Sequence, residues 1–284
     1  MSATAKPSEP RSSLAKIVVM AAPNGARRGY ADHPAIPLTA RESAESAAAL
    51  AEAGVSVLHL HVRDRDGRHS IDPELYREAI SEVRKSAGPR LVIQVTSEAV
   101  GQFSPAEQMA MVRELKPEAV SLSLKELCPD ENAEAEAGRF FAALRGNGTW
   151  PQYILYSSDE LERFDRLRRK GFFGEDQPFC LLVLGRYSSS LEGDPAELSA
   201  MLDAVNLAGS PWAACCFGRQ ENAAMLAAAE AGGHVRLGFE NNLVMADGST
   251  ASDNTALIRQ FVESSAGLGR EPATSDDVRE IFNL

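Results

Sequence analysis

The chain has 284 residues, of which 44% are apolar and 24% are charged, and these proportions exclude a disordered or fibrous protein. Its 29 basic and 40 acidic residues give a net charge of −11 at pH 7, which argues against a nucleic-acid partner. No stretch approaches the roughly 18 apolar residues of a membrane span, and residues 1–13 lack the apolar core of a signal peptide, so we expect a cytoplasmic protein that contacts no membrane.

Residues 1–14 are polar and predict a flexible arm, whereas residues 15–284 predict a single domain. Four cysteines are too few for a disulfide framework in a chain of this length. They lie in or beside apolar runs, so we expect them to pack in the core of a protein from a reducing compartment. They are Cys128, Cys180, Cys215 and Cys216.

Short β-rich runs alternate with helical segments along the whole domain. The eight predicted strands are residues 16–22, 55–62, 90–96, 119–124, 152–157, 179–185, 212–217 and 234–239. Eight strands are the number that closes a (β/α)8 barrel, the TIM-barrel fold. A doubly wound sheet is built from the same units, but no G-x-G-x-x-G follows the first strand. We therefore favour the barrel.

The segments between the strands carry signals for helix starts. Thr39 and Glu42 form a capping-box pattern, and Gly54 after the Ala-rich run indicates the end of that helix. An N-cap residue precedes proline at 72–73, 104–105 and 194–195, where the missing N–H of proline costs nothing. Thr274 and Asp277 predict one more short helix that ends at Leu284.

The segment LHLHV (58–62) places two histidines on one face of the second predicted strand. Successive side chains of a strand alternate between its faces, so the aliphatic residues pack outward while His59 and His61 point into the barrel near its active end. Two imidazoles at this spacing can bind one metal ion. Core histidines satisfied by hydrogen bonds are the plainer reading, but the charged run that follows argues against it.

The eighth predicted strand repeats this alternation. Arg236, Gly238 and Glu240 fall on its inward face, where an Arg and a Glu are costly without a partner or a charged ligand. A salt bridge between Arg236 and Glu240 would explain them. Alternatively, Glu240 is the third metal ligand, since two His and one Glu form a known catalytic zinc set, and Arg236 is left to hold an anion.

Further polar residues follow the first and third predicted strands. Gln94 and Thr96 share one face of the third strand, and Ser97 and Glu98 follow; hydroxyls there can bind a carboxylate, although Thr is also a common strand residue. The turn after the first strand carries Arg27 and Arg28, which suit carboxylate or phosphate recognition unless they are solvated loop charges.

Three segments in the same order along the chain resemble the β-keto acid cleavage enzymes. They are APNGA (22–26), HLHVRD (59–64) with DGR (66–68), and GGHVRLGFENN (232–242). The resemblance runs from about residue 16 to 284 and includes the member that cleaves 3-keto-5-aminohexanoate. It implies a zinc-dependent (β/α)8 barrel, usually tetrameric, that condenses a β-keto acid with acetyl-CoA to give acetoacetate and a new acyl-CoA.

By motif position, the resemblance makes His59, His61 and Glu240 zinc ligands and Arg236 the arginine that stabilises the transition state. Thr96 and Ser97 fall where the family holds the carboxylate of the keto acid. We also expect Asn24 and Arg27, in the matched first turn, to contact the substrate.

Three positions depart from the family pattern. Asn241 stands where many members carry the acidic residue thought to be the base, so Asn241 is a candidate catalytic residue of undetermined role. Arg27 replaces a glutamate of the amino-keto acid enzyme, which predicts an anionic or neutral polar distal group on the substrate. GRYSS (185–189) replaces a glycine-rich turn after the sixth strand.

Two other functions remain open at this point. A zinc hydrolase on the same barrel would use metal-bound water, but such barrels place the H-x-H on the first strand and need more inward histidines than this five-histidine chain offers. A non-catalytic metal-binding barrel is favoured by the missing acidic residue at Asn241. Another divalent ion could also replace zinc.

Overall fold

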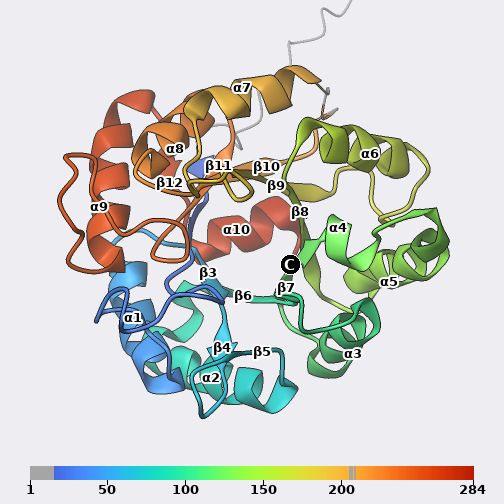
Figure 1. The fold of residues 1–284 in the computed structure, drawn as a ribbon, viewed down its shortest axis with the longest axis horizontal. Helices are drawn as coiled ribbons and strands as arrows, with labels where there is room; N and C mark the ends of the chain where they lie inside the picture. Colours follow the sequence, from blue (N-terminus) through green and yellow to red (C-terminus); the bar gives the residue numbers. More distant parts are fainter. Residues whose placement is uncertain (1–15, 205–206, 208) are drawn as a thin grey trace, which may run out of the picture.

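The computed structural model describes residues 16–204, 207 and 209–284, so the predicted arm at residues 1–14 lies outside the described residues. Eight parallel strands form a closed barrel with helices around it (Figure 1). In their order around the barrel, these strands are β10 (Trp212–Cys216), β11 (His234–Leu237), β2 (Val19–Ala21), β3 (Val57–Leu60), β6 (Val92–Thr96), β7 (Ala119–Ser123), β8 (Trp150–Leu155) and β9 (Phe179–Leu184). The predicted barrel is confirmed, and the doubly wound alternative is wrong.

Helices follow the strands in the chain order expected of the fold. They are α1 (Ala40–Glu52), α2 (Pro73–Ala87), α3 (Pro105–Leu115), α4 (Leu124–Leu127), α5 (Glu134–Gly146), α6 (Ser158–Arg169), α7 (Pro195–Ala204), α8 (Glu221–Glu230), α9 (Asn254–Ser265) and α10 (Ser275–Phe282), with 3-10 turns at Gly88–Arg90, Glu131–Ala133 and Ala266–Leu268. The predicted caps Thr39, Asp72, Ser104 and Thr274 each accept a first-turn N–H. Asp194 accepts the Ala196 N–H at 2.8 Å. None of the described helices is long and apolar enough to cross a membrane.

Several strands are shorter than predicted. The first divides at Val18, and its first part, β1 (Lys16–Ile17), pairs with β12 (Glu271–Pro272) outside the barrel. After β3 the chain leaves the barrel as a hairpin of β4 (Val62–Arg63) and β5 (His69–Ser70). These changes leave the inward and outward residues of β3 as predicted.

Helix α10 closes one end of the barrel, where it crosses the centre in Figure 1. The Phe282 ring lies 4.3 Å from that of Trp150 and 4.9 Å from that of Phe179, the residues that begin β8 and β9. The amino ends of the strands are thus sealed by apolar packing. In this fold the active site usually lies at the carboxyl ends of the strands.

Candidate metal centre and substrate pocket

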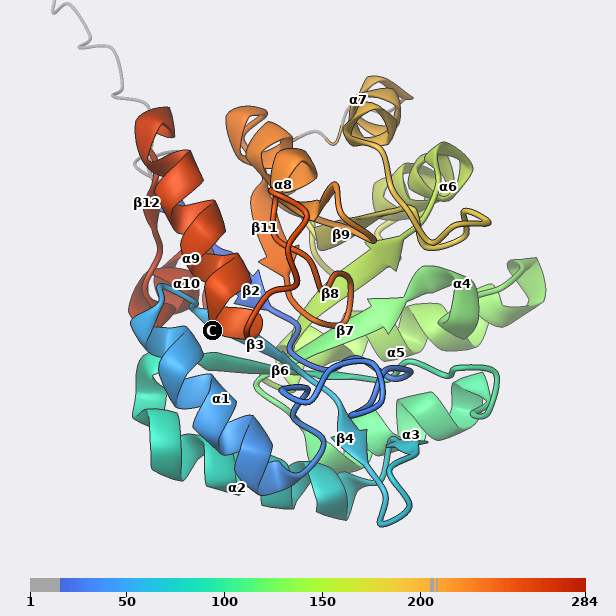
Figure 2. The same cartoon turned by 60° about the vertical axis from the view of Figure 1, so that its left-hand side comes forward.

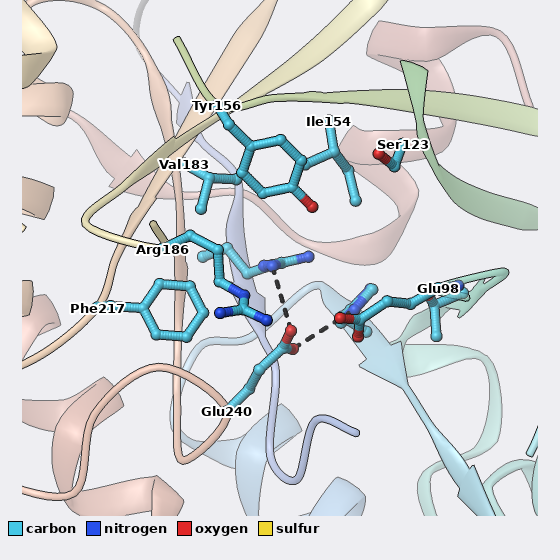
Figure 3. A pocket seen from close by; sticks show the side chains of 11 residues that line it. Glu98, Ser123, Ile154, Tyr156, Val183, Arg186, Phe217 and Glu240 are labelled. Atoms are coloured by element: carbon cyan, nitrogen blue, oxygen red, sulfur yellow. Dashed lines mark hydrogen bonds and ion pairs between the residues drawn. The ribbon is translucent and has the colours of Figure 1, made fainter. Parts of the chain in front are cut away.

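A pocket lies at the carboxyl ends of the barrel strands. Seven of the eight strands, or the residues just after them, contribute its lining: His59, Thr96, Glu98, Ser123, Ile154, Tyr156, Val183, Arg186, Phe217, Arg236 and Glu240. In Figure 3, Arg186 and Glu98 enter from opposite sides, Tyr156 hangs over the pocket and Glu240 lies at its lower edge.

His59, His61 and Glu240 bring three metal-binding atoms together. The two Nε2 atoms are 3.1 Å apart, and Glu240 Oε2 lies 3.5 Å from that of His59 and 3.6 Å from that of His61. Ligands of a tetrahedral zinc with bonds of 2.0–2.1 Å are separated by roughly 3.3 Å. Glu240 Oε2 has no hydrogen-bond donor among the described residues although it is buried. The three side chains therefore fit a divalent metal.

The surrounding chain holds these three side chains in place. His59 Nδ1 bonds to Gln94 Oε1 at 2.9 Å, which orients the ring and turns its Nε2 toward the centre. Glu240 lies against Gly25, where a Cβ would come within 2.6 Å of Glu240 Cγ at a φ of +64°. Only glycine allows this approach of the loop after β2, drawn in dark blue beside β4 in Figure 2.

Both ionisation states suit metal binding. Burial, reinforced by the charge of Arg236, lowers the pKa of His59 well below 6.5, so the ring is neutral and can ligate. Burial alone would raise the pKa of Glu240, but the Arg236 guanidinium and the two imidazoles outweigh it and hold that pKa well below 4.5. The centre thus presents the Glu240 carboxylate and, at His59, a neutral imidazole.

Arg236 lies at the floor of the pocket, 3% exposed, and its Nη2 is 3.6 Å from Glu240 Oε1. A charge-assisted hydrogen bond is usually 2.7–2.9 Å long, so the salt bridge considered from the sequence is present but loose. Arg236 Nε and Nη1 are buried without partners among the described residues. Buried donors of this kind require an acceptor, which a bound anion supplies.

Of the other predicted site residues, only Thr96 lines the pocket. Its Oγ1 accepts the Glu98 N–H at 3.1 Å. Ser97 turns away and donates to Gln108 Oε1 at 3.2 Å, and Asn24 donates to the His61 carbonyl at 3.1 Å. Arg27 is outside the lining and pairs with Glu98 at 2.8 Å.

Asn241 is also outside the lining, and its buried amide has no hydrogen-bond partner among the described residues by distance and angle. The backbone carbonyl of Asn241 accepts hydrogen bonds from the Arg28 guanidinium at 3.3 Å and from the Gly218 N–H at 3.1 Å. Arg28 donates to the Phe239 carbonyl at 2.7 Å as well. Arg28 and Asn241 thus stabilise the loop that carries Glu240. A role of Asn241 in catalysis stays a prediction.

Three large side chains of the pocket were not predicted from the sequence: Tyr156, Arg186 and Phe217. Each comes one or two residues after a barrel strand, at the end where active-site loops begin. That position is the signal that could have identified them. His33 and His234 are explained by hydrogen bonds to Ala251 and Val18, at 2.9 and 3.1 Å, away from the pocket.

Comparison with known proteins shows which family the chain is similar to. The protein family described as beta-keto acid cleavage enzyme matches residues 16–284. A 3-keto-5-aminohexanoate cleavage enzyme of Fusobacterium nucleatum is 30% identical over 276 residues, which cover 95% of this chain and 99% of that protein. A 3-oxoadipate:acetyl-CoA acetyltransferase of Cupriavidus necator is 24% identical and covers 89% of each chain.

Solved structures support the fold. One described as a binary complex of ObcA with oxaloacetate is similar with a TM-score of 0.73 at 17% identity, covering 88% of this chain and 68% of that one. Together with the family match over residues 16–284, these relatives show that the chain belongs to the β-keto acid cleavage enzyme family.

Proposed function

We propose that the protein moves the CH2COO⁻ unit of a β-keto acid onto the acetyl group of acetyl-CoA, with zinc as its metal. The C2–C3 bond of the keto acid breaks and C2 bonds to the acetyl carbon, which gives acetoacetate. The CoA sulfur passes from the acetyl carbon to C3, which gives the new acyl-CoA. The observation that carries the proposal is the convergence of His59, His61 and Glu240 beside the buried Arg236.

His59, His61 and Glu240 would hold the metal. When bound, a divalent ion supplies Lewis-acid polarisation of the substrate oxygens. Gln94 keeps the His59 ring in the orientation that offers its Nε2. The similarity to the 3-oxoadipate:acetyl-CoA acetyltransferase supports a thioester as the second substrate.

Arg236 offsets the negative charge that develops when the keto acid loses a proton or its C2–C3 bond breaks. Its unpartnered Nε and Nη1 are preorganised for this because burial fixes the side chain before substrate arrives. Thr96 Oγ1 accepts from the Glu98 N–H and keeps its own proton available to the keto acid carboxylate.

The reaction also needs a proton acceptor for C2, and an asparagine amide at position 241 cannot serve at neutral pH. Glu98 and Glu240 are the carboxylates among the described residues that line the pocket. Glu240 is assigned to the metal, so we assign the proton to Glu98. One Glu98 oxygen pairs with Arg27 at 2.8 Å, which fixes the direction of the carboxylate.

The test is an assay of the purified protein with a panel of β-keto acids, each with and without acetyl-CoA, in which acetoacetate and acyl-CoA are measured by mass spectrometry. We expect both products only when both substrates are present, and loss of turnover on metal chelation that zinc restores. Consumption of keto acid without a thioester would instead indicate a hydrolase. No turnover with one metal ion bound per chain would indicate a non-catalytic barrel.

A further inference from the structure

Arg186 directly follows Gly185 at the end of β9 and lies in the pocket lining, half-buried. It belongs to GRYSS (185–189), the segment that departs from the family pattern. We propose that Arg186 binds a carboxylate at the distal end of the keto acid and makes this enzyme selective for β-ketodicarboxylates. This inference rests on the proposed function and names the substrate class of the same site.

The side-chain N–H groups of Arg186 donate no hydrogen bond to the described residues. Within residues 16–204, 207 and 209–284, Arg27 and Arg236 each have a carboxylate within 4.0 Å, whereas no ion pair or side-chain hydrogen bond involves Arg186. A guanidinium carries five N–H donors in a planar fork that matches a carboxylate. Among the described residues that line the pocket, Arg186 is therefore the cation without an ion-pair partner within 4.0 Å.

Two aromatic rings hold Arg186 without using those donors. Its guanidinium carbon lies 5.6 Å from the centre of the Phe217 ring and 5.5 Å from that of Tyr187. Contacts with a ring face orient a guanidinium through its charge and its flat surface. The side chain is thus positioned before a ligand arrives, which reduces the entropy lost on binding.

The loop beneath Arg186 is tied at both ends. Ser188 Oγ donates to the Gly185 carbonyl and accepts from the Glu192 N–H, both at 2.9 Å. The Gly193 N–H donates to the Phe217 carbonyl at 2.8 Å. These bonds fix the loop against the end of β10, so the position of Arg186 is set by the barrel.

Arg186 also lies where the distal end of the substrate should reach. If Thr96 on β6 holds the keto acid carboxylate, the rest of the molecule extends past the metal ligands toward β9, which is three strands from β6 around the barrel. Figure 3 shows Arg186 on the side of the pocket opposite Glu98. The CoA phosphates fit less well, because the whole pantetheine arm separates them from the reacting thioester.

The electrostatics discriminate in the same direction. Glu98 pairs with Arg27, and Glu240 with Arg236 and the metal it would bind. The charge of Arg186 also acts on Glu126, the pKa of which burial raises, but no ion pair within 4.0 Å joins these two residues. The guanidinium of Arg186 therefore stays available to an anion of the substrate. The charge of Arg186 attracts a distal carboxylate on the substrate and repels a distal ammonium group. It has no electrostatic effect on the binding of a distal methyl group.

The experiment compares kcat/KM for 3-oxoadipate and 3-oxohexanoate, which share a six-carbon chain and differ in the carboxylate at its end, with acetyl-CoA as the second substrate. We expect the wild type to prefer 3-oxoadipate. Arg186→Gln should lower kcat/KM for 3-oxoadipate by about 10- to 100-fold and leave that for 3-oxohexanoate within about threefold. Arg186→Lys should retain part of the preference because it keeps the charge.

Two variants serve as controls. Arg27→Gln removes another cation near the mouth and should leave the ratio between the two substrates unchanged, even if both rates fall. Arg219→Gln, at an exposed position two residues after Phe217, should change neither rate. An unchanged ratio in Arg186→Gln overturns the inference, and so does a raised KM for acetyl-CoA alone, which would assign the guanidinium to the coenzyme.

Calorimetric binding of 3-oxoadipate without acetyl-CoA separates this inference from the proposed function. Binding that weakens in Arg186→Gln, in a protein that turns over no keto acid, supports the carboxylate site and contradicts the reaction. Turnover of both acids with equal efficiency supports the reaction and contradicts the carboxylate site.

Discussion

The floor and the rim of the pocket are built differently. At the floor, His59, His61 and Arg236 are at most 3% exposed and come from β3 and β11 or the residue just beyond β3. At the rim, the Arg27 side chain is 47% exposed, and its partner Glu98 and Arg186 lie on loops. The floor has one geometry that the barrel enforces, whereas the rim can change without disturbing the barrel. We infer that the floor carries the chemistry and the rim selects the substrate.

The largest effect should come from breaking the floor. In a His59→Ala/His61→Ala double variant, we expect bound zinc to fall from one equivalent to near none and turnover to fall to background, because one carboxylate remains of three ligands. Metal analysis by mass spectrometry, with circular dichroism to confirm folding, measures this. A folded double variant that retains one equivalent of zinc would exclude the centre at these residues.

Removing the rim carboxylate should have the next largest effect. Glu98→Gln keeps the size of the side chain but cannot take a proton, so we expect kcat to fall by about 100-fold or more with the metal content unchanged. Steady-state kinetics with the preferred keto acid measures it. A kcat close to that of the wild type would transfer the role of base to another group.

A smaller effect is expected when the positive charge of Arg236 is kept but the planar guanidinium is replaced. Arg236→Lys retains the positive charge and loses the planar fork, so kcat should fall by about tenfold or more with little change in stability. Kinetics and thermal unfolding on the same preparation separate the two. An unaltered kcat would make Arg236 a structural partner of Glu240 only.

The histidines of the floor could be predicted because their local geometry is simple. Strand β3 and the extended residue after it keep strict alternation, so Leu58 and Leu60 enter the outer core while His59 faces the pocket. This prediction needed no long-range information. The same alternation is seen in β10, where Cys215 packs inside the barrel and Cys216 packs outside it.

Glu240 was expected at the pocket for an incorrect reason. Strand β11 ends at Leu237, and Gly238 has a φ of +135°, so alternation does not extend to Glu240. Its backbone N–H donates to the Ala22 carbonyl at 3.0 Å, which is what turns the residue inward. Phe239 packs in a separate cluster with Ile36, Ala251 and Leu257 of α9.

The rim could not be derived from the sequence. Arg27 and Glu98 are 71 residues apart, and their ion pair depends on where two loops meet. Alternation says nothing about loop side chains, so Arg27 was predicted to face the substrate although it pairs with Glu98 outside the lining. Arg186 was noted only as part of an unusual segment.

The smallest expected effect concerns a carboxyl group behind the floor. Glu221, which begins α8, is 1% exposed, and its two oxygens accept from the Gly238 N–H at 3.0 Å and the Asn242 amide at 3.2 Å. Burial raises its pKa to about 8, although these hydrogen bonds and the charge of Arg28 oppose the shift. The group is therefore protonated in the folded protein at pH 7.

This raised pKa fixes the sign of a pH effect on stability. Between about pH 4.5, the ordinary value for Glu, and about pH 8, the folded state binds a proton that the unfolded state has released. The stabilisation is full below this range and is lost as the pH rises through it. Glu221→Gln does not titrate, so its unfolding temperature should fall less between pH 5 and pH 8 than that of the wild type, by at least about 2 °C.

Differential scanning calorimetry measures the difference, with Glu263→Gln at an exposed position as the control. Equal pH slopes in all three proteins would mean that Glu221 is ionised throughout, and the loop that carries Glu240 would then rest on a buried charge.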